Sequence, residues 1–481
     1  TTTTGTAIDI QGTGNTGTMS FTSVSANGGT AGIVLSNFTG GSFTVTGAGG
    51  ACGPADTTCS GGTIQNMTGG DDSSAVPVGS GVVLNNVASV SLTRLRIRSN
   101  SNYGLRGTSV AGFTMDTCFL DGTTGTNGAT PYNDGAVSFD NLTGSATVSN
   151  SNIQGGFSNN FRLVNTSGTL NRITFSNVTF DVSGASPAND ALTIESQGAA
   201  VVNVTVQNSF FKSAAGDLFQ LNNIGTGADD LVFTGNTLTN GNSAIATGGG
   251  GVTIGSNGTG NITSNFSNNT LRDAVGHAIL FFKSTGSATV TGTFDNNTIG
   301  VSGAANTGSA EGDGIKVQNA GQGTVKVTIT NNQIRQYNVF GIELLTGGGA
   351  SAMPGALNAT ITGNTIAQPG NTAGTIGLPK NGIHVNDGTV VGDTYQVCAD
   401  IVSNSMTGSG ADAVPPTGIV ADFRLRQRQA TTLRLPNYAG ANNDNAAAVA
   451  FVSGNNGGAS GLASNTVPTG GGFTGGAGSC P

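Results

Sequence analysis

Apolar residues recur at every second position in short segments of the chain, and Gly, Asn and Ser separate these segments. The stretch VTITNNQIRQYNVFGIELL, from Val327 to Leu345, contains two such segments around an asparagine pair, and a near copy, ATITGNTI, returns at Ala359. Alternation with a period of two residues is typical of β-strands, and Gly and Asn are typical of tight turns. The stretch therefore predicts one unit of a repeat made of short strands.

The pattern apolar-x-x-Asn-x-apolar, with other residues in place of Asn in the earlier copies, locates this unit along the chain. Its closing residues are Ile97, Leu120, Ile153, Phe180, Phe211, Leu238, Leu271, Ile299, Ile334, Ile366 and Met406. The unit is roughly 30 residues long, within the range of repeats that form solenoids and propellers. A second apolar segment follows most copies, as in DGIKV at Asp313, FGIEL at Phe340 and NGIHV at Asn381. Each unit therefore holds at least two strands.

Composition favours a coil of strands over a helical repeat. Glycine accounts for 80 of the 481 residues and charged residues for only 9%, whereas helices favour Ala, Leu, Glu and Lys. We therefore predict an all-β parallel solenoid in which one unit makes one turn, with about a dozen or more turns and a continuous apolar core.

One position of the unit is asparagine in the later copies. These residues are Asn236, Asn269, Asn297, Asn332, Asn364 and Asn404, and the earlier occupants are Leu95, Cys118, Ser151, Val178 and Ser209. Asparagine tolerates the left-handed backbone of a tight bend, and its amide can donate to one neighbouring turn while accepting from the other. We therefore predict a buried ladder of stacked amides, with Cys118 as a small buried residue in the same column.

The C-terminal segment departs from the repeat. We predict that residues 1–429 form the coil and that residues 430–481 form a cap, with a flexible linker as the alternative. Within the cap, Asp444 or Asn445 can begin a short Ala-rich helix that Gly454 ends. The tail GFTGGAGSCP has no core-forming pattern of its own.

The N-terminal segment from about Thr4 to Val34 alternates like strands and holds nothing that could cap a coil. Free strand edges are templates for pairing with another strand. The predicted partners are other copies of the chain or an upstream part of the same chain.

The cysteine positions indicate an oxidising location. Cys52 and Cys59 flank a short loop, and Cys480 lies at the extreme C-terminus. We predict disulfides between Cys52 and Cys59 and between Cys398 and Cys480, with Cys118 unpaired, and hence an extracellular or cell-surface protein. The alternative is five reduced thiols in a cytosolic protein.

Charge and hydropathy argue against two classes of partner. The formal net charge is −8 and the isoelectric point is about 4.6, so the basic face that nucleic acid requires is missing. Apolar runs in the sequence are shorter than the roughly 18 residues of a membrane span. We therefore predict neither a nucleic-acid partner nor a membrane span.

The best candidate for chemistry is a column of polar residues on adjacent turns. In the x-Gly-apolar-x-apolar strand the residue between the two apolar positions faces outward, which gives Lys316, Glu343 and His384, with Asp313 and Asp387 near the ends. Carboxylates beside a basic residue can act as acid and base on a sugar polymer. The competing interpretations are a carbohydrate-contacting surface and an ordinary solvated face.

Cofactor and metal sites are not predicted. The chain has only two histidines and no zinc-type spacing of Cys and His. The acidic turns GGDD at Gly69 and GADD at Gly227 are isolated rather than repeated, so they are interpreted as solvated loops and not as calcium sites.

In its repeated strand-turn units, the chain from about Ile33 to Val420 resembles the right-handed parallel β-helices of the pectin-lyase-like superfamily. In composition it is most similar to the Gly/Asn/Thr-rich β-strand repeats of large secreted bacterial surface proteins. The resemblance implies a right-handed coil but not an activity, because this coil carries lyases, hydrolases, adhesins and passive stalks alike.

The leading hypothesis is a secreted, non-enzymatic structural or adhesive β-helix of a bacterial cell-surface stalk, fibre or matrix that assembles end to end. Carbohydrate is a further possible partner. The alternative is a polysaccharide lyase or glycoside hydrolase that uses the Lys316, Glu343 and His384 column. A third interpretation, a tailspike-like recognition module, predicts trimers.

Overall fold

The computed structural model describes residues 4–12, 14, 16–56, 58–181, 190–239, 249–349 and 351–481. The predicted all-β parallel β-helix is confirmed, since the strands stack in parallel ranks from turn to turn. Two compact units divide the chain. Unit 1 is Thr1–Leu221, Gly227–Asp229 and Gly241–Gly249, and unit 2 is Asn222–Thr226, Asp230–Asn240 and Gly250–Pro481.

The strands of unit 1 form three ranks. A rank is a stack of parallel strands in which each strand pairs with the equivalent strand of the next turn. The first rank holds β1 (Ile8–Ile10), β4 (Ala31–Phe38), β13 (Asn159–Asn165) and β16 (Asp190–Ser196). The second holds β2 (Thr18–Phe21), β5 (Ser42–Val45), β14 (Thr169–Ser176) and β17 (Val201–Gln207). Three long strands run through both ranks: β7 (Ser80–Thr93), β9 (Tyr103–Asp116) and β11 (Gly135–Ser149). The third rank holds β3 (Ala26–Asn27), β6 (Thr63–Gln65), β8 (Arg96–Arg98), β10 (Phe119–Asp121), β12 (Asn152–Gln154), β15 (Thr179–Asp181) and β18 (Phe210–Phe211).

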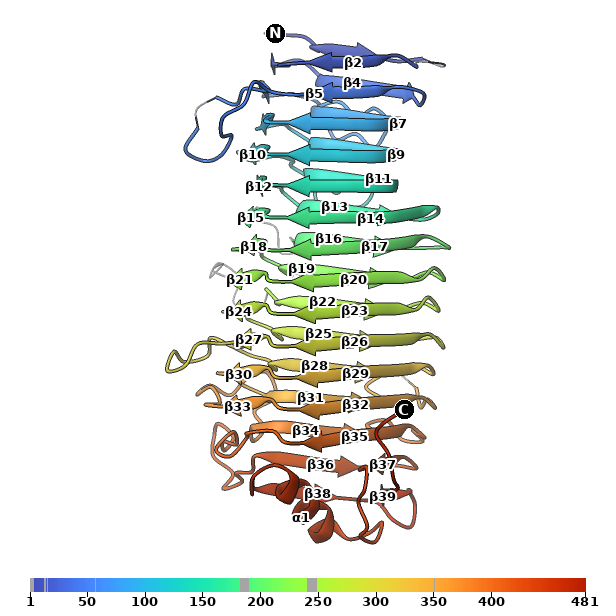
Figure 1. Cartoon of the computed structure of the whole chain (residues 1–481), viewed down its shortest axis with the longest axis vertical. Helices are drawn as coiled ribbons and strands as arrows, with labels where there is room; N and C mark the ends of the chain where they lie inside the picture. Colours follow the sequence, from blue (N-terminus) through green and yellow to red (C-terminus); the bar gives the residue numbers. More distant parts are fainter. Residues whose placement is uncertain are drawn as a thin grey trace. The chain divides into compact units, whose positions relative to one another are not determined.

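Unit 2 repeats this arrangement (Figure 1). Its first rank holds β22 (Val252–Ser256), β25 (Ile279–Lys283), β28 (Ile315–Asn319), β31 (Phe340–Thr346), β34 (Asn381–Asp387), β36 (Phe423–Gln427) and β38 (Gly461–Ser464). The second holds β23 (Ile262–Ser267), β26 (Thr289–Asp295), β29 (Thr324–Thr330), β32 (Ala356–Thr362), β35 (Gln396–Val402), β37 (Thr432–Arg434) and β39 (Gly472–Thr474). The third holds β21 (Thr237–Thr239), β24 (Thr270–Arg272), β27 (Thr298–Ile299), β30 (Gln333–Arg335) and β33 (Thr365–Ala367). The chain passes between the units at β19 (Phe219–Asn223) and β20 (Asp229–Thr234).

The period-two pattern sets which side chains enter the core. In β29, Val325, Val327 and Ile329 are buried, whereas the alternate Lys326 is exposed. The same positions are buried in the paired strands β26 and β32, so apolar side chains stack through successive turns. Stacking of this kind gives each unit a continuous core, as expected for a solenoid.

The predicted asparagine ladder is present in unit 2. All six asparagines are buried. The Asn332 Oδ1 atom accepts hydrogen bonds from the backbone N and the Nδ2 of Asn297, both at 2.9 Å. The Asn332 Nδ2 atom donates to Asn364 Oδ1 and to the Phe294 carbonyl, again at 2.9 Å. Each amide therefore joins the turn before it to the turn after it.

The ladder ends on a residue that the repeat did not predict. Asn456 follows the helix α1 (Asn445–Asn455), and its Oδ1 accepts from the backbone N and the Nδ2 of Asn404 at 2.9 and 3.0 Å. In unit 1, Ser151 and Ser209 take the asparagine role through their hydroxyl oxygens, which accept from the backbone N–H groups of Cys118 and Val178. Serine therefore forms a simpler version of the same inter-turn bond.

The predicted place of the left-handed bend was wrong by one residue. Positive φ values occur at Asn268, Asn296 and Asn331, each directly before a ladder asparagine, and Gly363 takes this role before Asn364. Only one residue can turn the chain while the next points its amide inward. In the pair NN, the first asparagine therefore adopts the left-handed conformation that bends the chain, and the second stacks its amide on the neighbouring turns.

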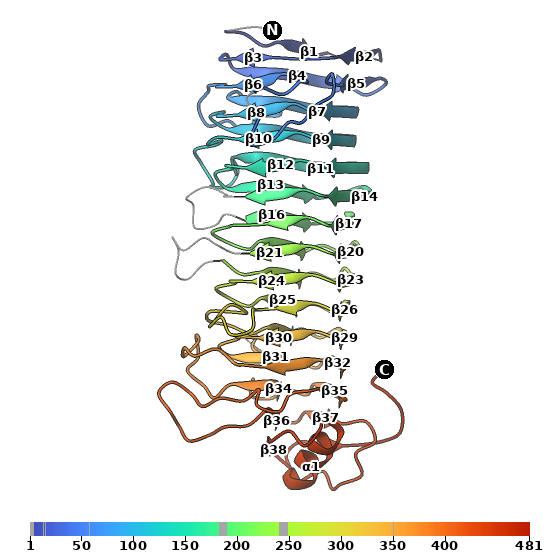
Figure 2. The same cartoon turned by 60° about the vertical axis from the view of Figure 1, so that its left-hand side comes forward.

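The last turns of unit 2 carry the cap. Helix α1 lies beside β38 (Figure 1, Figure 2). Asp444 is its N-cap and accepts from the Ala447 backbone N, as predicted. The expectation that Gly454 ends the helix was wrong, because the helix continues to Asn455. The tail has no core-forming pattern in its sequence, yet Phe473 of β39 is buried.

Strands β37, β38 and β39 continue the ranks beyond residue 430. The boundary between coil (1–429) and cap (430–481) stays a prediction.

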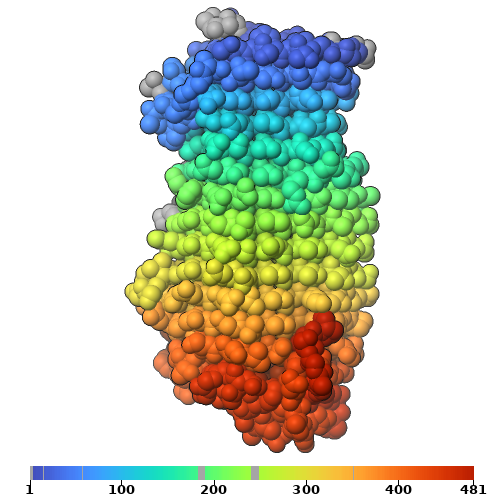
Figure 3. Space-filling model, viewed as in Figure 1, coloured from blue at the N-terminus to red at the C-terminus, as the bar shows by residue number. Residues whose placement is uncertain are grey.

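Both predicted disulfides are present, between Cys52 and Cys59 and between Cys398 and Cys480. The second holds the C-terminal tail against the outer side of β35, and Figure 3 shows this tail in dark red against the surface of the last turns. Arg434 also holds this tail, because its guanidinium group donates to the carbonyls of residues 477, 478 and 479. Cys118 is free and buried, and burial raises the pKa of its thiol to about 12, so it is unreactive at neutral pH.

Candidate functional site

The predicted column of Lys316, Glu343 and His384 exists. These residues occupy matching register positions on β28, β31 and β34 of unit 2, and Arg424 of β36 continues the column. Parallel pairing places residues in the same register on one face of a sheet, one strand apart. The alignment of the repeat therefore correctly predicted that Lys316, Glu343 and His384 are neighbours on adjacent strands.

The alternative interpretation of this column as an ordinary solvated face was wrong. The Glu343 and His384 side chains are only 6% and 2% exposed, and the Lys316 side chain is 19% exposed. The Phe340 ring covers the imidazole of His384, with the two ring centroids 4.1 Å apart. Outward-facing positions are thus buried wherever other side chains pack over the sheet.

Glu343 is bound from both sides within the column. Its Oε2 lies 3.0 Å from Lys316 Nζ, and its Oε1 lies 3.5 Å from His384 Nδ1. Burial opposes ionisation of Glu343, but the His384 contact and the Lys316 charge outweigh it and hold the carboxyl pKa well below its usual range. Burial also lowers the pKa of His384, and the nearby Glu343 only partly offsets this effect.

This arrangement suits structural support better than catalysis. A general acid or base needs a pKa near the working pH and contact with its substrate. Glu343 is held ionised by Lys316 and is buried, so it is placed to join neighbouring turns. Neither ring nitrogen of His384 makes a hydrogen bond.

Asp313 also braces the coil from its buried position. Its Oδ1 accepts from the Phe340 backbone N at 2.8 Å, its backbone N donates to His277 Nδ1 at 3.1 Å, and its Oδ2 lies 3.1 Å from the same nitrogen. Residues 277, 313 and 340 stand at the start of successive first-rank strands. Asp313 therefore connects three turns at one corner.

Asp387 lies inside the coil rather than on its outer face. It is fully buried, its Oδ1 accepts from Thr346 Oγ1 at 2.7 Å, and its Oδ2 has no hydrogen-bond partner. Burial, reinforced by the charge of Asp393, raises the pKa of Asp387 to about 7. The carboxyl therefore binds its proton more tightly in the folded chain than in the unfolded chain.

We expect the Asp387→Asn variant to lose less stability between pH 5 and pH 8 than the natural chain. A group whose folded pKa is raised stabilises the fold at low pH, and this contribution is lost as pH rises to the folded pKa. For Asp387 the loss is on the order of 2 kcal/mol across this window. Urea unfolding at pH 5, 6.5 and 8 checks this result. Parallel pH profiles for the two proteins would contradict it.

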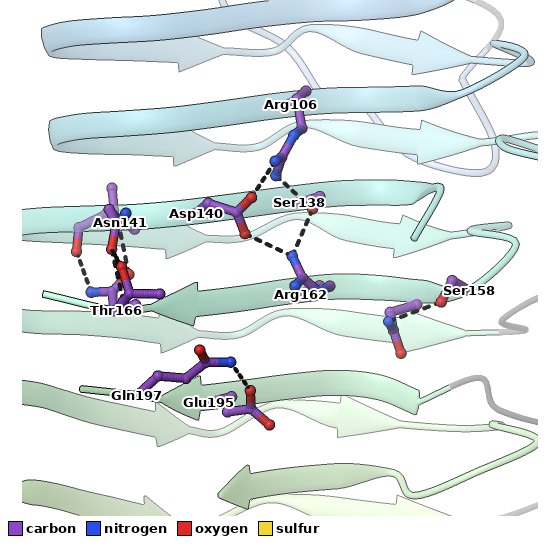
Figure 4. Close-up of polar contacts among 12 residues, drawn as sticks. Arg106, Ser138, Asp140, Asn141, Ser158, Arg162, Thr166, Glu195 and Gln197 are labelled. Carbon is purple, nitrogen blue, oxygen red and sulfur yellow. Dashed lines mark hydrogen bonds and ion pairs between the residues drawn. The ribbon is translucent and has the colours of Figure 1, made fainter. Parts of the chain in front are cut away.

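The sequence interpretation missed a polar network in unit 1. Asp140 of β11 binds Arg106 of β9 and Arg162 of β13, and Arg106 also donates to Ser138 (Figure 4). Two arginines on the turns either side hold the pKa of Asp140 below its usual range, although burial acts in the opposite direction. The network joins three turns in the same way as the Glu343 column.

A second missed feature is the pair Asp190 and Asp217 in unit 1. Asp190 Oδ1 accepts from the Asp217 backbone N at 2.8 Å. Burial, together with the Asp217 charge, raises the pKa of Asp190 to about 7. Both residues come directly before apolar strand segments, as Asp313 does, and this shared position was the signal that could have identified them.

Metal and membrane features are not found in the part of the chain that the structure describes. No group of three or more His, Cys, Asp or Glu side chains there could hold a metal ion. Within the same residues, no helix is long and apolar enough to cross a bilayer.

Comparisons with protein-family models, curated proteins and solved structures gave no match to this chain. The parallel solenoid is shown by its own strand pairing. The likeness to pectin-lyase-like proteins and to bacterial surface repeats, and the right-handed sense of the coil, stay predictions.

Proposed function

We propose that this chain is a secreted structural or adhesive β-helix of a bacterial cell surface, as part of a stalk, a fibre or an extracellular matrix. The observation that carries the proposal is the buried state of the candidate catalytic column. Its only carboxylate, Glu343, forms an ion pair with Lys316 and contacts His384. Charged groups that hold turns together favour a mechanical role over turnover.

Two further observations support this role. In unit 1, Asp140 bridges arginines on the turns either side of it. The two disulfides suit an oxidising, extracellular location. A low share of charged residues, 9% of the chain, is consistent with a repeat whose polar side chains bond to each other.

The proposed partners are other copies of the chain or an upstream part of the same chain. In unit 1, β1 pairs with β4, β2 with β5 and β3 with β6, and the other edge of each of these first strands has no pairing among the described residues. Unpaired edges favour strand addition. In unit 2, α1 lies against the last turns.

The mass of the native protein in solution tests this assignment. We expect assemblies larger than one chain, and we expect deletion of residues 1–30 to leave a soluble monomer because the first strands supply the contact. The matched control deletes the tail after Leu435. Loss of assembly in the control alone would place the contact at the opposite end, and a monomeric natural protein would argue against self-assembly.

An enzyme is the competing assignment, and it predicts turnover of an extracellular polymer. A panel of acidic and neutral polysaccharides should give no product above background. Turnover that the Glu343→Gln or Lys316→Ala variant abolishes would overturn the structural role and establish a lyase or hydrolase at this column. Turnover that both variants retain would also overturn the structural role, and Asp190 and Asp217 would then be the next candidate catalytic residues.

A further inference from the structure

Most arginines near the coil surface are paired. Arg96 binds Asp121, Arg106 and Arg162 bind Asp140, and Arg434 donates to carbonyls of the tail. Strand β36 and the residues after it differ. Arg424, Arg426 and Arg428 form no ion pair within the described residues, and Arg424 and Arg426 also make no side-chain hydrogen bond there.

These three arginines converge on one face of unit 2. Arg424 and Arg426 alternate with buried residues along β36 and therefore face outward. In register they lie beside His384 and Asn386 of β34. Arg428 turns back toward the same place, because its Nη2 donates to Asn386 Oδ1. The three arginine side chains therefore lie near one another on this face.

Buried polar atoms near this position also lack partners. Arg428 Nε is buried and makes no hydrogen bond, and His384 Nε2 is likewise buried without a hydrogen bond. His384 is only 2% exposed. Unsatisfied buried donors in a native structure require an explanation, and an absent ligand is one.

Neighbouring carboxyl groups do not neutralise the cluster. Glu343 is bound by Lys316, and Asp387 lies inside the coil, where its charge only partly offsets the effect of burial and of the other two arginines on Arg428. Burial, followed by the charge of Arg426, lowers the pKa of both Arg424 and Arg428. This shows that the three cations are close enough to repel one another. An acidic chain thus carries a local excess of positive charge.

We propose that Arg424, Arg426 and Arg428 form a binding site for a dianionic phosphate group, either inorganic phosphate or a phosphate monoester. Guanidinium groups match phosphate oxygens with paired N–H donors, and such charged hydrogen bonds are about twice as strong as neutral ones. A phosphate group with a charge near −2 offsets more of the repulsion among three cations than a carboxylate with a charge of −1 does. The site does not depend on the proposed structural role.

Isothermal titration calorimetry of the full chain at pH 8 tests the site, with inorganic phosphate and phosphoserine as the probes and acetate at matched ionic strength as the comparison. We expect phosphate binding that weakens about tenfold or more in the Arg424→Gln/Arg426→Gln variant, because charged hydrogen bonds are lost. Arg335→Gln is the matched control, since Arg335 is half-buried on β30, as Arg424 and Arg426 are on β36, and its side chain bonds only to Gln333. It should bind as the natural chain does.

Thermal melting separates binding from folding. Without phosphate the double variant should melt at the same or a higher temperature, because like charges are removed, and added phosphate should stabilise only the natural chain and the control. Tighter binding of phosphoserine identifies a monoester as the ligand, and tighter binding of inorganic phosphate identifies the free anion. No heat of binding, equal affinity in the double variant, or equally strong acetate binding would overturn the proposal.

Discussion

Replacement of Asn332 by leucine is expected to lower the free energy of unfolding by about 3 kcal/mol or more, because buried groups lose their partners at about 1–3 kcal/mol each. The Asn332 amide accepts from the backbone N and Nδ2 of Asn297 and donates to the Phe294 carbonyl. Leucine has a similar size but can replace none of these bonds. Chemical denaturation of the natural and variant chains measures the difference.

The neighbouring Asn331 supplies the matched control. It is exposed and has a φ of 56°, a left-handed conformation that glycine adopts freely. Gly363 already occupies the same position one turn later. The variant loses one exposed hydrogen bond, from Asn331 Nδ2 to Asp295 Oδ1, so we expect Asn331→Gly to lower stability by no more than about 1 kcal/mol. Equal losses in the two variants would show that the ladder is not a main source of stability.

Repetition explains why much of this fold could be predicted. Each turn restates the same period-two pattern, so alignment of the copies was enough to place Lys316, Glu343 and His384 in one column. Alignment also identified the ladder, because Asn recurs at the position that faces the neighbouring turns. Strand direction and register follow from the repeat itself, since each turn must bury the same apolar face.

Burial of the outward column could not be predicted in this way. It depends on Phe340, which packs on His384 from a position where the neighbouring turns have Asp313 and Asn381 instead of an aromatic residue. The Arg106, Asp140 and Arg162 network was missed for a related reason. Arg106 and Arg162 share a register with Ser138, and Asp140 reaches both arginines from two residues farther along β11. Contacts that cross between columns leave no periodic signal.

The cap contains the least predictable contacts. Asn456 completes the asparagine ladder from the end of a helix, and Phe473 enters the core from a glycine-rich tail. Neither residue lies in a copy of the repeat. Their positions are set by how the last strands return to the coil, and tertiary packing of this kind overrides local composition.

Removal of the disulfide between Cys398 and Cys480 is expected to cost about 4 kcal/mol of unfolding free energy, whereas removal of the one between Cys52 and Cys59 should cost about 2 kcal/mol. The first links residues 82 positions apart and the second links residues 7 positions apart. A disulfide restricts the unfolded chain, and the entropy it removes grows with the length of the closed loop. The paired Cys→Ser variants can be compared by guanidinium denaturation.

The tail gives this comparison a structural readout as well. Strand β39 keeps the start of the tail paired with β37, but without the disulfide the last residues, 477–481, are held mainly by Arg434, which donates to the carbonyls of residues 477–479. Single hydrogen bonds of this kind contribute about 1 kcal/mol each, and less where water competes, so hydrogen exchange should show the tail opening before unit 2 unfolds. In the Cys52→Ser/Cys59→Ser variant the tail should stay protected. A larger loss of stability from that variant would contradict the loop-length argument and would locate the main constraint in unit 1.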